Sequence, residues 1–126
     1  MKKVHERFLE YVKVDTKSDE TTRVTPSTKG QLELGKILAE ELKKIGVDEV
    51  RISDKGYVYA CLKSNCDKDI PKIGFISHMD TAPDMSGKNV NPKIVEHYDV
   101  KILNLEMDIH YHQIFHQNFQ CIKVKL

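Results

Sequence analysis

The sequence has no tryptophan, no long apolar run and almost no excess of either charge. Because no stretch approaches the roughly 20 apolar residues that cross a bilayer, a membrane-spanning helix is not expected. Lysine and arginine together number 20, against 19 aspartates and glutamates, so the formal net charge is +1 and gives no indication of a nucleic-acid or anionic-membrane partner. The lysines near the start have no apolar segment behind them, so no signal peptide is predicted.

Cysteine is scarce as well, and its number is odd. Three cysteines favour a reducing compartment over a disulfide framework, which predicts a cytoplasmic location. Cys61 and Cys66 have four residues between them, but no second Cys/His pair with zinc-finger spacing follows. Free thiols are therefore the expectation, with a structural zinc site as the less favoured alternative.

The 126 residues are enough for one modest domain with a hydrophobic core. Two segments have apolar residues at helical spacing, two alternate around an Asp-Lys-Gly turn, and two are short apolar runs beside a proline. We therefore predict an α/β fold in which helices pack on a mixed sheet. In chain order, the expected elements are helices at 3–14 and 28–45 and strands at 49–53, 57–62, 72–77 and 92–98.

The second expected helix has recognisable signals at both ends. Thr28 and Gln31 have the spacing of a capping box, in which each side chain would bond a free backbone N–H of the first turn. Gly46 would supply the left-handed residue that ends the helix.

The most informative local pattern is the apolar run from Ile73 to Ser77, which leads directly into His78 and then Asp80. Such a run is typical of a buried strand, and open α/β sheets bind ligands at the carboxyl ends of their strands. A neutral imidazole binds Zn²⁺, and a nearby carboxylate fixes its tautomer. The pair therefore predicts part of a zinc site, because catalytic zinc needs about three protein ligands. The alternative is a polar strand end in which Asp80 caps a turn.

Two other polar clusters have simpler interpretations. The acidic stretch from Asp15 to Glu20 is typical of a solvated loop. His110, His112 and His116 are a possible metal-ligand set, but the polar segment around them has neither a helix nor a strand period.

Four collinear stretches closely resemble a known family. They are Phe8–Thr16, Gly56–Ala60, Gly74–Asp84 and Ser86–Pro92. The family is peptidase T, cytosolic bacterial tripeptide aminopeptidases related to two-zinc aminoacylases and carboxypeptidases. The resemblance runs from about residue 5 to Asp99.

The resemblance implies that residues 1–99 are the N-terminal part of a metallopeptidase catalytic domain and therefore an incomplete one. It implies His78 as a zinc ligand and Asp80 as the catalytic carboxylate that orients the imidazole. It also implies two zinc ions in the complete enzyme, and tripeptides and other short peptides as substrates. The family's other zinc ligands and its general-base glutamate have no matching motif here, so we expect this chain alone to be inactive.

Residues 100–126 differ in character from what precedes them. The last glycine is Gly87 and the last proline is Pro92. With suitable codons, one added nucleotide near codon 100 gives Asp-Gly-Lys-Asp and later Ser-Pro and Phe-Pro, as the resemblance leads us to expect. The segment is thus a divergent tail, possibly out of frame, that we expect to pack poorly. Two alternatives to a peptidase remain open: a non-catalytic truncated fragment of a disrupted gene, and a small metal-binding protein that uses the tail histidines.

Overall fold

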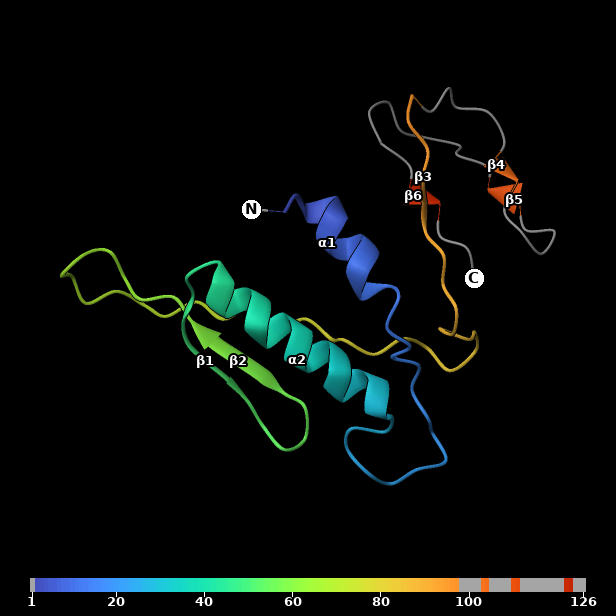
Figure 1. The fold of residues 1–126 in the computed structure, drawn as a ribbon. Helices are drawn as coiled ribbons and strands as arrows, with labels where there is room; N and C mark the ends of the chain where they lie inside the picture. The colour runs from blue at the N-terminus through green and yellow to red at the C-terminus, as the bar shows by residue number, and fades with distance from the viewer. Residues whose placement is uncertain (1, 98–102, 105–109, 112–121, 124–126) are drawn as a thin grey trace.

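The computed structural model describes residues 2–97 and three short strands beyond them, at 103–104, 110–111 and 122–123 (Figure 1). The described strands pair two by two, and every pair is antiparallel: β1 with β2, β3 with β6 and β4 with β5. The elements in chain order are α1 (Val4–Tyr11), α2 (Lys29–Lys44), β1 (Asp48–Ile52), β2 (Val58–Cys61), β3 (Lys93–Ile94), β4 (Leu103–Asn104), β5 (His110–Tyr111) and β6 (Ile122–Lys123).

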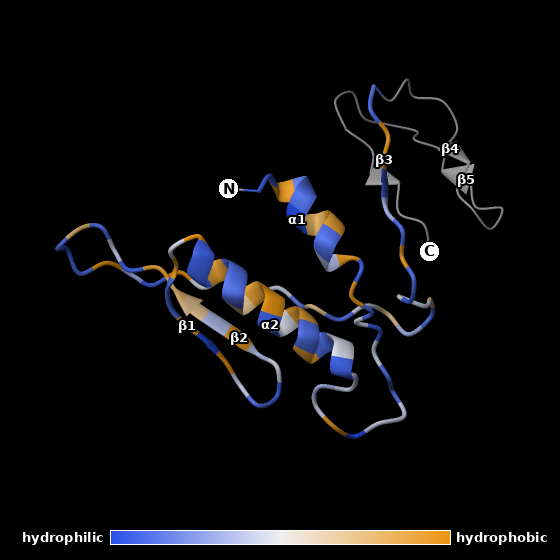
Figure 2. Cartoon of the chain, in the orientation of Figure 1, coloured by the Kyte–Doolittle hydropathy of each residue, from blue (hydrophilic) through white to orange (hydrophobic). Residues whose placement is uncertain are grey.

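Both predicted helices are confirmed, and α2 lies between α1 and the β1–β2 hairpin (Figure 1). Apolar segments alternate with hydrophilic ones along both helices (Figure 2), as expected for helices with one packed face. The buried apolar side chains among the described residues are Leu34 and Ala39, both on α2. Neither described helix combines the length and apolarity needed to cross a membrane.

The two helices are joined by a polar cluster at one end of α1. The Tyr11 hydroxyl donates to the carboxylate of Glu41, and the Arg7 guanidinium lies 3.3 Å from the other oxygen of that carboxylate. Burial, followed by the hydrogen bond to Glu41, raises the pKa of Tyr11 to about 12. The phenol therefore stays protonated, and remains a donor, across the physiological range.

Glycine ends α2 as predicted, but the predicted capping box at its start is wrong. Gly46 takes a φ of +85°, and its N–H donates to the carbonyl of Lys43 at 3.1 Å. At the other end, the Thr28 hydroxyl donates to the carbonyl of Lys17 at 3.0 Å instead of accepting from its own helix. The Gln31 side chain likewise forms its hydrogen bonds with Ser27 and with the carbonyl of Thr16. Tertiary contacts with the preceding loop take both side chains away from the local cap.

The predicted hairpin is confirmed. Its turn closes through two hydrogen bonds, from Ser53 N–H to the carbonyl of Tyr57 at 2.9 Å and from Gly56 N–H to the carbonyl of Ser53 at 3.0 Å. Gly56 has a φ of +82°, which only glycine adopts readily. A Cβ at Gly35 of α2 would lie 3.1 Å from the Cδ1 of Ile52, so the absence of a side chain there lets the helix pack closely against β1.

The predicted strand at 72–77 is wrong, and with it the interior-strand position expected for His78. These residues form no strand, and Ile73, Phe75 and Ile76 are 82%, 95% and 101% exposed. Apolar residues on both faces of a run are typical of a strand buried on both sides, which needs neighbouring strands for its backbone bonds. Among the described residues no strand pairs with this run, so its backbone lacks the hydrogen bonds that would make it a strand.

Two other predictions about the sheet also need correction. The described strands form antiparallel pairs and not the predicted mixed sheet, and the run at 72–77 pairs with none of them. The strand expected at 92–98 is shorter, with β3 covering Lys93–Ile94. Most of the tail at 100–126 lies outside the described residues. The prediction that the tail packs poorly falls on those residues.

The exposed apolar run makes a testable prediction about solubility. An exposed apolar segment with free backbone N–H and C=O groups is a template for association, so the chain should self-associate as its concentration rises. The double substitution Phe75→Glu and Ile76→Lys should shift sedimentation-velocity profiles toward monomer. Leu62→Lys, which removes a single exposed leucine outside the run, is the matched control. Equal association of the double variant and the original chain would contradict this explanation.

Candidate functional site

The structure brings His78 and Asp80 together as the sequence predicts. The Nδ1 of His78 lies 3.2 Å from the Oδ1 of Asp80. A carboxylate can only accept, so Nδ1 must carry the proton in this contact, and Nε2 of the neutral ring keeps a free lone pair. His78 is 84% exposed, so that nitrogen is accessible to a ligand.

Asp80 has a second hydrogen-bond partner that the sequence analysis missed. The Ser18 hydroxyl donates to Oδ2 of Asp80 at 2.6 Å. This bond is the main cause of a lowered pKa at Asp80, opposed by partial burial and reinforced by His78. The carboxylate is therefore held in its charged, accepting form.

A pair of backbone hydrogen bonds fixes the segment that carries Ser18 against the segment that carries Asp80. The N–H of Ser18 donates to the carbonyl of Thr81 at 2.9 Å, and the N–H of Thr81 donates to the carbonyl of Thr16 at 3.2 Å. Lys17 and Thr81 thereby form a parallel bridge. We call this contact between residues 15–18 and 80–82 the loop bridge.

The loop bridge corrects the interpretation of Asp15 to Glu20 as a solvated loop. Thr16 is only 3% exposed, and the Gln31 side chain donates to its carbonyl at 3.4 Å. Two glycines leave room for the segment: a Cβ at Gly30 would lie 1.7 Å from the carbonyl oxygen of Asp15, and one at Gly87 would lie 2.6 Å from an Asp15 carboxylate oxygen. The chain at Asp15 therefore passes between the first turn of α2 and the loop after Asp80.

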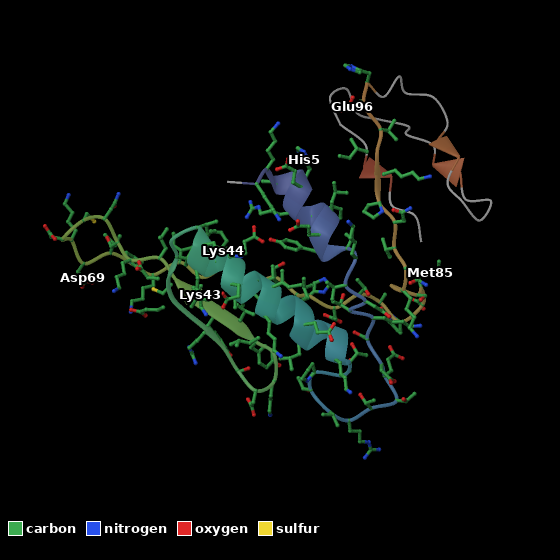
Figure 3. All side chains as sticks on the ribbon, in the orientation of Figure 1. His5, Lys43, Lys44, Asp69, Met85 and Glu96 are labelled. Carbon is green, nitrogen blue, oxygen red and sulfur yellow. The ribbon has the colours of Figure 1, made fainter. Side chains whose placement is uncertain are left out.

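Two cavities meet at the His78–Asp80 pair. The larger, of about 760 Å³, is lined on one side by apolar residues of α1 and α2, such as Phe8 and Leu38, and on the other by residues 77–87. The smaller, of about 390 Å³, lies against the hairpin turn at Tyr57. Met85, which lines the larger cavity, is marked in Figure 3 in the loop that leads on toward β3. Concave space beside a polar pair is where a small ligand would bind.

The described residues do not complete a zinc site. Within them, no group of three or more histidine, cysteine, aspartate or glutamate side chains is placed to hold a metal ion. His78 and Asp80 fit the chemistry of one ligand and its orienting carboxylate, which is fewer than catalytic zinc requires. Cys61 and Cys66 are exposed and form no disulfide within the described part of the chain. The side chain of His110, and all of His112 and His116, lie outside the described residues.

No protein-family model matches the sequence. Named proteins do match it, and with high identity. Peptidase T of Clostridium perfringens strain SM101 is 95% identical over 105 residues, which are 83% of this chain and 26% of that relative. Peptidase T of Clostridium acetobutylicum is 57% identical over 108 residues, which are 86% of this chain and 26% of that relative.

The chain is homologous to peptidase T. It spans about a quarter of the length of the curated relatives it matches. Only four residues precede residue 5, so a match of 105 residues must extend past Asp99, to residue 105 or beyond. The division of the chain at residue 99 remains a prediction.

The glycines at the loop bridge allow a direct test of its importance. Gly30→Ala forces a methyl group into the Asp15 backbone, and overpacking of this kind costs about 1–3 kcal/mol. The variant should unfold at lower urea and shift the amide NMR signals of Ser18 and Thr81. Gly74→Ala is the control, because a Cβ there meets nothing within 4 Å. Unchanged Ser18 and Thr81 signals in Gly30→Ala would contradict the described packing.

Proposed function

We propose that this chain is the N-terminal part of a zinc-dependent tripeptide aminopeptidase, with His78 as a zinc ligand and Asp80 as the catalytic carboxylate that orients it. The observation that carries the proposal is the 95% identity to a peptidase T. The contact between His78 Nδ1 and Asp80 Oδ1 supports the two residue roles, because it leaves Nε2 free to bind a metal. The proposed substrates are tripeptides and other short peptides, and the proposed location is the cytoplasm.

In this proposal the chain contributes only some of the residues of the active site. His78 is the one zinc ligand we assign among the described residues, whereas catalytic zinc takes about three protein ligands, and the complete enzyme would hold two such ions. The remaining ligands and the general base would come from parts of the relatives that this chain does not span. Alone, it would not hydrolyse peptides.

A non-catalytic truncated fragment of a disrupted gene is the second candidate, and one observation favours it. The run that contains Ile73 and Phe75 is exposed without a pairing strand among the described residues. A run of this kind is expected where a sheet has lost its neighbouring strands. The third alternative, a small metal-binding protein, has no observation in its favour, since its histidine side chains lie outside the described residues.

Activity measurements test the proposed enzyme. The purified 126-residue chain should release no amino acid from a tripeptide. A full-length chimera, in which residues 2–97 replace the matching part of the Clostridium perfringens enzyme, should be active. There His78→Ala should abolish activity, and Asp80→Ala, which removes the orienting carboxylate, should reduce it by about 10–100-fold. His97→Ala is the matched control. Tripeptide hydrolysis by the short chain that is lost on His78→Ala would overturn the proposal, as would an inactive chimera.

The disrupted-gene candidate has its own test in the DNA. Resequencing around codon 100 should show that one inserted nucleotide restores a frame reading Asp-Gly-Lys-Asp, with Ser-Pro and Phe-Pro downstream. Codons that give none of these in the shifted frame would contradict the frameshift explanation and favour a native tail.

A further inference from the structure

We propose that Ser18 is a positioning residue, whose hydroxyl holds the Asp80 carboxylate in the orientation from which Asp80 holds the His78 imidazole. This inference rests on the roles proposed above for His78 and Asp80. It adds a third member, from a segment 60 or so residues earlier in the chain, to a pair that the sequence alone suggested.

The geometry divides the two oxygens of Asp80 between two partners. Oδ1 faces the Nδ1 of His78 at 3.2 Å, and Oδ2 accepts from the Ser18 hydroxyl at 2.6 Å. The terminal torsion of an aspartate is broad, so the carboxylate can turn unless both sides are engaged. The shorter bond is the one to Ser18. It therefore fixes the rotation of the carboxylate at which the other oxygen faces the imidazole.

Packing against the described residues does not replace this bond, because the His78 side chain is 84% exposed. The orientation of the imidazole therefore depends on the carboxylate, and the orientation of the carboxylate depends on Ser18.

The position of Ser18 does not depend on its own hydroxyl. Its backbone N–H bonds the carbonyl of Thr81, and Thr81 bonds back to Thr16, which is buried. Thr28 holds the intervening Lys17 carbonyl at 3.0 Å. Removal of the hydroxyl should thus leave the loop bridge in place and release only the carboxylate, which separates a positioning role from a structural one.

The test uses the 126-residue chain and a signal that reports the imidazole directly. Ring ¹⁵N shifts, recorded at a pH where the imidazoles are neutral, give the fraction of each histidine protonated on Nδ1. A hydrogen bond from Nδ1–H to the Asp80 carboxylate favours the Nδ1-protonated tautomer. The fraction of this tautomer should therefore be higher at His78 than at the exposed His97. The excess should fall to the His97 level in Ser18→Ala, as it does in Asp80→Ala, and should persist in Ser18→Thr, which keeps the hydroxyl.

Ser53→Ala is the matched control, because its hydroxyl bonds the hairpin turn at Tyr57 and lies outside the site. The proposal is overturned if the excess of the Nδ1-protonated tautomer at His78 persists in Ser18→Ala. It is also overturned if that excess is lost in Ser18→Thr. Slow exchange of the Thr81 amide is followed in parallel. Its loss in Ser18→Ala would give Ser18 a role in holding the backbone instead, which also overturns the proposal.

The full-length chimera then separates this inference from the proposed function. An inactive chimera would refute the proposed peptidase, while the tautomer measurement would still decide the role of Ser18. In an active chimera, Ser18→Ala should lower kcat by about 10-fold with little change in KM, as expected for loss of support to a ligand, and Ser18→Thr should restore it. An unchanged kcat would overturn the proposal.

Discussion

The candidate site depends on the loop bridge between residues 15–18 and 80–82. Two backbone hydrogen bonds join segments that are more than 60 residues apart in sequence, and the Ser18–Asp80 bond extends the same contact into side chains. Closing so long a loop costs conformational entropy, so the contact must be supported from several sides. It is supported by α2, through Thr28 and Gln31, and by the glycines that leave space around Asp15.

The hydrophobic packing that surrounds this contact is modest. Leu34 and Ala39 are the buried apolar side chains among the described residues, while Ile73, Phe75 and Ile76 face solvent. A fold gains stability mainly by burying apolar surface against the entropy of ordering its chain. Here hydrogen bonds and the Tyr11–Glu41 contact join elements that a larger core would otherwise hold together. Homologues about three times as long as this chain have additional residues that could cover the exposed run.

Hydroxyl groups have an unexpected share in the arrangement. Thr16 and Ser18 come from the acidic stretch interpreted as a solvated loop, and Thr28 comes from the predicted capping box. Thr16 is instead buried, the Ser18 hydroxyl bonds the carboxylate of the site, and the Thr28 hydroxyl bonds the segment that carries Ser18. For Ser18 and Thr28 a hydroxyl satisfies a group on another segment, whereas Thr16 takes part through its backbone carbonyl. Local rules for loops and helix caps describe what such residues do when no partner is near, and here tertiary partners replace the local ones.

Features that depend on neighbouring residues could be predicted from the sequence. Helical spacing gave α1 and α2, the Asp-Lys-Gly turn gave the hairpin, Gly46 ended α2, and the proximity of His78 to Asp80 followed from their separation by a single residue. Tertiary structure alone decided whether the run at 72–77 became a strand, because strand bonds come from a partner that the run cannot supply. It also decided that Ser18 meets Asp80 and that Thr28 leaves its own helix. Those contacts join residues far apart in the chain, and no periodicity or spacing in a single sequence records such a distance.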